Sequence, residues 1–249
     1  MCTLIILRRP NHNWPLLLAG NRDEMRNRSW IPPGRHWEDR AEVVAGLDQQ
    51  AGGSWLGIND YGVIAAVMNR QGTLGPAAGK RSRGELVLAA LDHALAQEAA
   101  EALSDLDPQA YRAFNLFIGD PVSSFWLRNQ GGQVEIFSIP PGLHMLTAHE
   151  IDDSTVPRIR VYLPRFQEAK VPDPAVKNSW EMWQSLLASR LYLDEDGPHA
   201  AMNLDFPNGF GTVCSHLLAV PRYPGFGFKP VFLFAGGPPD RAKFIPVAI

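Results

Sequence analysis

Short apolar runs separated by turn residues dominate the first part of the chain and predict paired β-strands. Residues 3–7 form an apolar run rich in Ile and Leu, and residues 15–19 repeat this character after a loop of Pro, Asn and His, which predicts a buried hairpin. Residues 54–58 and 63–68 flank an Asn-Asp-Tyr-Gly turn in which Gly62 can adopt a positive φ. The pattern therefore predicts two hairpins ahead of the first helix.

The rest of the chain alternates between helical periods and short strands. From residue 82 to about residue 103 apolar residues recur at helical spacing, which predicts one helix. Ser82 followed three residues later by Glu85 resembles a capping box. Further helices are predicted at residues 158–168 and 179–192. Strands are predicted at residues 114–119, 123–128 and 134–138, which form an antiparallel meander, and at 212–220 and 230–234.

The order of these elements predicts the fold class. Helices collected between runs of antiparallel strands are typical of an α+β fold in which two sheets pack face to face with the helices outside. No internal repeat, low-complexity tract or linker interrupts the 249 residues. We therefore expect a single domain over residues 1–249.

Composition narrows the function classes. Hydrophobic residues make up 45% of the chain and charged residues 20%, which is ordinary for a globular protein. The net charge is -3 and Lys and Arg are dispersed, so no nucleic-acid partner is expected. No apolar run approaches the roughly 18 residues of a membrane span. The amino terminus lacks a secretory signal pattern, which favours a cytoplasmic protein whose two cysteines are free thiols.

Cys2 is the first candidate for chemistry. Methionine aminopeptidases generally remove Met1 when a small side chain follows, which would leave a thiol and a free α-amine on one residue. Such an amine titrates at about 7.7 to 8.0 and a thiol near about 8.5, so one group can serve as base for the other. The alternative is that Cys2 is a small apolar residue that begins a buried strand.

Three polar residues are expected near Cys2. Arg22 and Asp23 close the second strand of the first hairpin, which returns beside the start of the chain. Arg22 can lower the thiol pKa and Asp23 can hold the α-amine, although the two also fit a structural ion pair. Asn69 follows a predicted strand, where its amide can stabilise an oxyanion or serve turn chemistry alone.

Other cofactor chemistry finds little support. Cys214, His216, His144 and His149 show no paired metal-ligand spacing, so we expect no metal. The glycines near residues 52–57 lack the Gly-Lys-Ser or Gly-Lys-Thr ending of a phosphate loop. No cofactor is therefore predicted.

Several short motifs, in this order, resemble the NRDE family, also called the transport and Golgi organisation protein 2 family. The resemblance is dense to about residue 120 and thinner afterwards. Its motifs are Cys-Thr-Leu at 2–4, Asn-Arg-Asp-Glu at 21–24, Gly-Gly-Ser-Trp-Leu-Gly-Ile-Asn at 52–59, Asn-Arg at 69–70, Ser-Arg-Gly-Glu at 82–85 and Phe-Asn-Leu at 114–116.

The resemblance implies both a fold and an activity. The family is similar to the N-terminal-nucleophile hydrolases, which implies a four-layer αββα sandwich of two antiparallel sheets. In related bile-salt hydrolases and penicillin V acylases the terminal cysteine attacks a non-peptide amide. Carried onto this chain, the resemblance implies that Cys2 is nucleophile and base, that Arg22 and Asp23 orient it, and that Asn69 donates to the oxyanion. The substrate would be a small amphipathic amide, cleaved through a Cys2 thioester.

Two segments depart from the family pattern. The chain has Leu-Thr-Ala-His at 146–149, with Ala148 and His149 where the family usually has a Leu-Ser-Asn segment. It has Val213 where the family usually has the arginine of Gly-Thr-Arg-Ser-Ser. The resemblance also implies a second hypothesis, because haem handling and lipid metabolism have both been proposed for the family. In it the same fold is a non-catalytic carrier or chaperone of haem or a lipid, with Cys2 or a histidine as an axial ligand.

Overall fold

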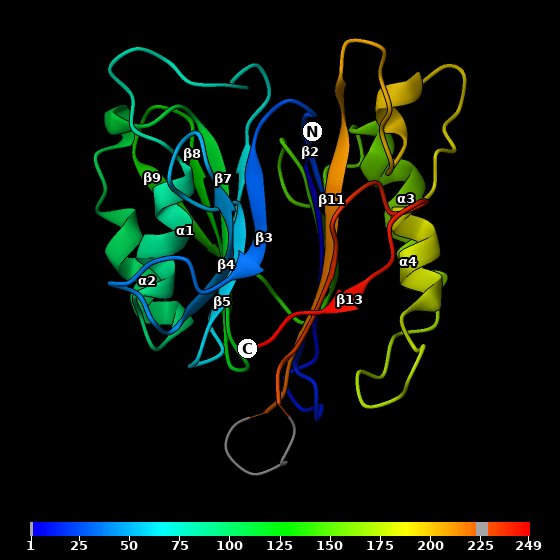
Figure 1. Cartoon of the computed structure of the whole chain (residues 1–249), viewed down its shortest axis with the longest axis horizontal. Helices are drawn as coiled ribbons and strands as arrows, with labels where there is room; N and C mark the ends of the chain where they lie inside the picture. Colours follow the sequence, from blue (N-terminus) through cyan, green and yellow to red (C-terminus); the bar gives the residue numbers. More distant parts are fainter. Residues whose placement is uncertain (1, 223–228) are drawn as a thin grey trace. The chain divides into compact units, whose positions relative to one another are not determined.

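The apolar runs at the two ends of the chain form one antiparallel sheet. The computed structural model describes residues 2–222 and 229–249, and Figure 1 shows the course of the chain. The sheet has six strands in the order β10-β1-β2-β11-β12-β13. These strands are β1 (Thr3–Arg8), β2 (Leu16–Met25), β10 (Gly142–Leu146), β11 (Phe210–Val220), β12 (Val231–Ala235) and β13 (Ile245–Pro246).

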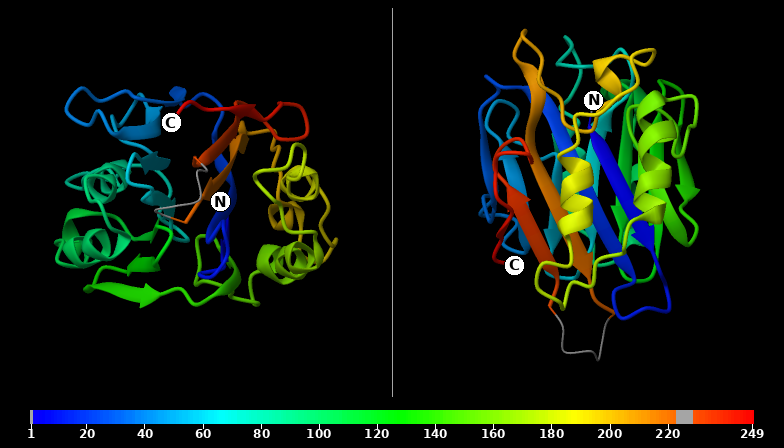
Figure 2. Two further views of the ribbon diagram at one scale, coloured as in Figure 1. Left: turned by 90° about the horizontal axis from the view of Figure 1, so that it is seen from below. Right: turned by 90° about the vertical axis from the view of Figure 1, so that its right-hand side faces the viewer.

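One face of this sheet packs against two helices. Apolar residues of the strands, among them Ile5, Leu17 and Leu217, belong to one buried cluster with residues of α3 (Pro157–Glu168) and α4 (Glu181–Leu187). Figure 2 shows both helices lying across this sheet. The residues of the central strands β1 and β2 are buried at consecutive positions.

Residues 28–140 build a second antiparallel sheet with its own helices. Its seven strands follow the order β3-β4-β5-β6-β7-β8-β9, and α1 (Gly84–Leu91) and α2 (Ala96–Ser104) share its buried apolar cluster. The strands are β3 (Trp30–Gly34), β4 (Val43–Asp48), β5 (Leu56–Asn59), β6 (Ile64–Asn69), β7 (Phe114–Gly119), β8 (Ser124–Asn129) and β9 (Val134–Ser138).

Contacts divide the chain into two compact units. The first comprises Met1–Asn27 with Pro141–Val247, and the second comprises Arg28–Pro140 with Ala248–Ile249. The expectation that residues 1–249 form a single domain stays a prediction.

Most predicted strands are confirmed, but one predicted helix is wrong. Residues 82–103 form α1 and α2 with a break at residues 92–95, because the buried Asn59 amide donates to the carbonyls of Leu91 and His93 and ends α1 there. The sequence did not predict β3, β4, β10 or β13, and α4 is shorter than the predicted helix at 179–192.

The predicted capping box is also wrong, because the N-cap residue of α1 is Arg83, which has no side-chain cap, and the Ser82 hydroxyl accepts from the Gly84 N–H at 3.2 Å and not from that of Glu85. Glu85 instead accepts a hydrogen bond from the Tyr111 hydroxyl at 2.5 Å and pairs with Arg81 at 2.6 Å. Both partners lie outside α1, so Glu85 joins the helix to neighbouring segments.

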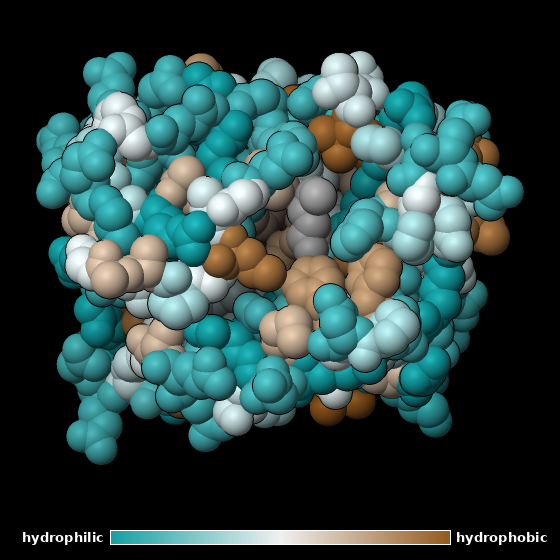
Figure 3. All heavy atoms as spheres, turned by 90° about the horizontal axis from the view of Figure 1, so that it is seen from above, coloured by the Kyte–Doolittle hydropathy of each residue, from teal (hydrophilic) through white to brown (hydrophobic). Residues whose placement is uncertain are grey.

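Hydrophilic side chains cover most of the face seen in Figure 3, and hydrophobic ones are interspersed among them. Among the described residues, the helices are too short or too polar to traverse a bilayer.

Candidate active site

Cys2 lies immediately before β1, where this strand meets the end of β2. The ladder pairs Thr3 with Asn21, so the Asn-Arg-Asp-Glu segment runs alongside the start of the chain, as the hairpin predicted. Cys2 is a free, half-buried cysteine, and its thiol lies 3.7 Å from the backbone carbonyl oxygen of Asp23, to which it donates a weak hydrogen bond. The first element of the predicted site is therefore assembled within the first unit.

The alternation of β2 sends its polar residues to opposite faces of the sheet. Asn21 and Asp23 share the helix-covered face with Leu17, and Asp23 reaches α3 on that face. Arg22 points to the other face, together with its ladder partner Cys214 on β11. Because Thr3 contacts Arg158 of α3, Cys2 one residue earlier takes the face of Arg22.

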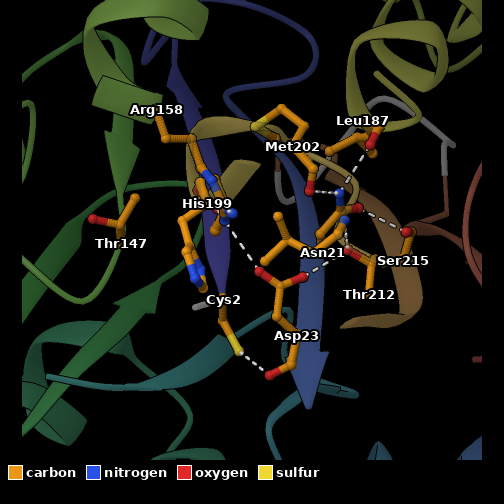
Figure 4. A network of polar contacts seen from close by, with 12 residues as sticks. Cys2, Asn21, Asp23, Thr147, Arg158, Leu187, His199, Met202, Thr212 and Ser215 are labelled. Carbon is orange, nitrogen blue, oxygen red and sulfur yellow. Dashed lines mark hydrogen bonds and ion pairs between the residues drawn. The ribbon is translucent and has the colours of Figure 1, made fainter. Parts of the chain in front are cut away.

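The Asp23 carboxylate is enclosed by donors on the helix-covered face. Its Oδ2 lies 3.1 Å from Nη1 of Arg158, and its Oδ1 accepts a hydrogen bond of 2.7 Å from the Thr212 hydroxyl. The side chains of Arg158 and Asp23 are 1% and 0% exposed. Figure 4 shows the carboxylate between these two partners, with the Cys2 sulfur near the Asp23 main chain.

Asn21 has a structural role beside this network. Its amide nitrogen donates to the carbonyls of Leu187 and Met202, each at 2.9 Å, and its oxygen accepts from the Ser215 hydroxyl at 2.7 Å. These bonds tie β2 to the end of α4 and to β11 (Figure 4). Asn21 therefore holds the strand that carries Arg22 and Asp23.

Burial dominates the electrostatics of Cys2. Desolvation raises the pKa of the Cys2 thiol above its usual value and the Asp23 carboxylate acts in the same direction, whereas Arg22 and the Asp23 backbone contact lower it. Arg22 lowers the thiol pKa as expected, but the effect of burial is larger and the net pKa is raised. A thiol with a raised pKa is protonated near neutral pH, so its use as a nucleophile requires a base.

Two further titratable residues of β11 share the face of Arg22. Burial raises the pKa of Cys214 to about 12. Burial, and then the positive charge of Arg22, lowers the pKa of His216 to about 3. His216 is 4% exposed, and its Nδ1 has no hydrogen-bond partner among the described residues. Within residues 2–222 and 229–249, no group of three or more His, Cys, Asp and Glu side chains could hold a metal ion.

Asn69 ends β6 in the second unit, opposite Phe114 of β7. Its proximity to Cys2 stays a prediction, as do the catalytic roles of Cys2, Arg22 and Asp23. Of the residues that depart from the family pattern, Ala148 is buried just after β10, and Val213 occupies the irregular step of the ladder between Thr212 and Cys214. A bulge of this kind redirects side chains at a strand end.

Arg158, Thr212 and Thr3 are the residues that sequence reasoning missed. Arg158 carries a recognisable signal, because it lies one helical turn before Tyr162 and two turns before Phe166, on the buried stripe of α3. A guanidinium on an apolar stripe requires a buried partner. The sequence does not indicate that this partner is Asp23.

Solved structures share this architecture across nearly the whole chain. Penicillin V acylase from Agrobacterium tumefaciens superposes with a TM-score of 0.50 at 14% identity, covering 95% of this chain and 83% of that one. An N-acylethanolamine-hydrolyzing acid amidase ortholog from Caenorhabditis elegans superposes with a TM-score of 0.54 at 12% identity, covering 87% of this chain and 92% of that one. A variant of conjugated bile acid hydrolase from Clostridium perfringens has a TM-score of 0.54 at 12% identity, and the match covers 98% of this chain and 92% of the hydrolase. The fold class is thus the αββα fold of N-terminal-nucleophile hydrolases, as expected.

The sequence itself places the chain in a narrower group. Residues 1–217 match the family model described as Transport and Golgi organisation 2, and the chain belongs to this family. The mouse homolog is 37% identical over 117 residues, which cover 42% of this chain and 38% of the mouse protein. The human homolog is 36% identical over 117 residues, with the same coverage. The chain thus spans well under half the length of these curated relatives.

Proposed function

We propose that this protein is a hydrolase that cleaves a linear, non-peptide amide in a small amphipathic molecule through a Cys2 thioester. The observation that carries the proposal is the position of Cys2, a half-buried residue whose thiol lies 3.7 Å from the Asp23 carbonyl oxygen where β1 meets β2. Arg22 lies on the same face of the sheet as Cys2, and the buried Asp23 carboxylate lies on the opposite, helix-covered face. The neighbours named as an acylase, an acid amidase and a hydrolase support this class of reaction.

The reaction requires Cys2 at the mature terminus. With Met1 removed, the α-amine takes the thiol proton and the sulfur attacks the amide carbonyl carbon, which places negative charge on the carbonyl oxygen. The Asn69 amide donates to this oxyanion. The carbon–nitrogen bond then breaks, the leaving amine carries away the proton, and a thioester remains on Cys2. Water attacks the thioester, releases a carboxylic acid and returns the proton to the sulfur.

Because the pKa of the Cys2 thiol is raised, the thiol needs a base, and the α-amine serves as this base. An amine that titrates at about 7.7 to 8.0 can accept the thiol proton near neutral pH. The Asp23 carboxylate, whose partners are Arg158 and Thr212, would hold the resulting ammonium.

Trapping of the thioester tests the proposal. Met1 lies outside the described residues, so the intact mass of the natively expressed protein is measured first. The protein is then incubated with a panel of acyl amides and examined by peptide mass spectrometry. We expect an acyl adduct on Cys2, and loss of both adduct and hydrolysis in Cys2→Ala.

The matched control is Cys214→Ala, which removes the buried cysteine of β11 and keeps hydrolysis. Met1 retained in an active protein, or hydrolysis that survives Cys2→Ala, would contradict the proposal. Saturable binding of haemin or lipid without amide turnover would assign the protein as a carrier instead.

A further inference from the structure

Residues 61–84 of the second unit carry four Lys and Arg side chains and no Asp or Glu. They include the loop at residues 71–80, which lies between β6 and α1. Glu85, the first acid after this stretch, pairs with Arg81 at 2.6 Å. Positive charge therefore predominates in this part of the chain.

Two guanidinium groups hold this loop by its carbonyl oxygens. Arg112 donates through Nη1 to the Leu74 carbonyl at 2.8 Å and through Nη2 to the Gly72 carbonyl at 3.1 Å. Arg83 donates through Nη2 to the Gly75 carbonyl at 3.3 Å, and Nη1 of Arg112 lies 3.2 Å from the same oxygen. Two positive charges thus converge on one uncharged acceptor.

The partners of Arg112 satisfy its hydrogen bonds but leave its charge uncompensated. Within residues 2–222 and 229–249, every hydrogen bond that this side chain donates goes to a carbonyl oxygen. A carboxylate or phosphate accepts hydrogen bonds, neutralises the charge and matches the planar fork of a guanidinium with two parallel bonds. An oxyanion therefore offers Arg112 an interaction that the loop carbonyls cannot supply.

The loop is accessible to an incoming anion. A side-chain carbon added at Gly72 or Gly75 would meet no other atom within 4 Å, and both residues adopt a positive φ. Leu74 between them is 50% exposed, and no residue of the loop belongs to the buried cluster beneath α1 and α2. An anion can thus replace the carbonyls without disturbing the apolar core of this unit.

We propose that Arg83 and Arg112 form a binding site for an oxyanion, the phosphate or carboxylate group of a small molecule, and that this anion displaces the carbonyls of the loop. The site lies within the second unit and does not involve Cys2. It is therefore independent of the proposed hydrolysis, and its test requires no amide substrate.

Isothermal titration of the full-length protein with inorganic phosphate, and separately with acetate, tests the site at constant ionic strength. We expect saturable binding at one site per chain, and tighter binding of phosphate or of acetate identifies which oxyanion the site prefers. Arg112→Met should weaken this binding by about tenfold or more, because it removes hydrogen bonds between charged groups. Absence of saturable binding of either anion to the wild type would overturn the proposal.

Arg40→Met is the matched control. Arg40 belongs to the same unit, but it already pairs with the carboxylates of Asp92 at 2.9 Å and Asp39 at 2.7 Å. This variant removes the same charge and should keep the wild-type affinity within about twofold. Equal weakening in Arg40→Met and Arg112→Met would show a general charge effect and overturn the proposal.

A second measurement uses the wild type alone, so it remains decisive if Arg112→Met does not fold. Phenylglyoxal modifies arginine side chains, and peptide mass spectrometry gives the rate at each position. The preferred anion should slow the modification of Arg83 and Arg112 and leave that of Arg40 unchanged. Rates at Arg83 and Arg112 that do not respond to the anion would overturn the proposal.

Discussion

Single residues of the first unit have their properties set by the face of the sheet that they occupy. Asp23 and Arg22 are neighbours in the chain, yet Asp23 bonds Arg158 and Thr212 whereas Arg22 acts on Cys2, Cys214 and His216. The period of two along a strand separates them. The Asn-Arg-Asp-Glu motif, which the sequence suggests is one polar cluster, is therefore divided between the two faces. Asp23 forms an ion pair on one face, and Arg22 lies near the cysteine thiols on the other.

His216 makes a residue-scale prediction about acid stability. Its pKa is about 3 in the folded protein and about 6.5 in an unfolded chain. Between these values the unfolded state binds a proton that the folded state does not, so stability is lost as pH falls through this window. We expect His216→Leu to weaken the pH dependence of the unfolding free energy by up to about 1.4 kcal/mol per pH unit.

Urea titrations at pH 7 and pH 5 measure this effect. At pH 7 the His216→Leu variant should be no less stable than the wild type, because the buried Nδ1 has no partner among the described residues. An unchanged pH dependence in the variant would show that His216 binds its proton equally in both states.

At the scale of elements, one buried asparagine decides where a helix ends. The Asn59 amide donates to Leu91 and His93 carbonyls at 2.8 and 2.7 Å, and its oxygen accepts from the backbone N–H groups of Tyr61 and Val63 at 3.1 and 2.9 Å. The same side chain thus closes the turn between β5 and β6 and caps α1. Helical periodicity continues past this point, but the tertiary contact overrides it.

We expect Asn59→Asp to destabilise the protein by about 2 to 5 kcal/mol, because it replaces two donors with oxygens that face carbonyls in a buried site. Chemical denaturation gives the value. Asn208→Asp is the control, since Asn208 is exposed and its Oδ1, which the substitution keeps as an oxygen, accepts from the Phe210 N–H. It should change stability by less than about 0.5 kcal/mol, and an equal effect in both variants would refute the role of Asn59.

At the scale of the whole molecule, the candidate site depends on contacts between the two ends of the chain. The first unit joins Met1–Asn27 to Pro141–Val247. Arg158 meets Thr3 across 155 positions and Thr212 meets Asp23 across 189. Contacts of this kind close large loops, which costs chain entropy. The network around Asp23 therefore requires both ends of the chain to be in place.

Sheet order predicts which backbone amides exchange most slowly. β2 and β11 each have neighbours on both sides and pair over ten positions, whereas β13 is a two-residue, exposed edge strand. Hydrogen exchange followed by mass spectrometry should show the strongest protection in β2 and β11 and the weakest in β13. Equal protection of β13 and β2 would contradict the strand order.

By itself, the sequence determined the features that depend on local pattern. The apolar runs identified β1, the start of β2 and the meander from β7 to β9, since periodicity and turn residues act over a few positions. It also brought Cys2 beside residues 21–24, because hairpin strands are neighbours in the chain. The resemblance carried by short motifs identified the family.

Only the tertiary structure decided how these elements use their polar groups. It assigned Asp23 to Arg158 and Thr212, ended α1 at Asn59 and let burial outweigh Arg22 at the Cys2 thiol. These outcomes depend on which distant side chain reaches a buried atom and on how much water is excluded there. Neither the distant partner nor the exclusion of water is determined by the residues that are neighbours in the sequence.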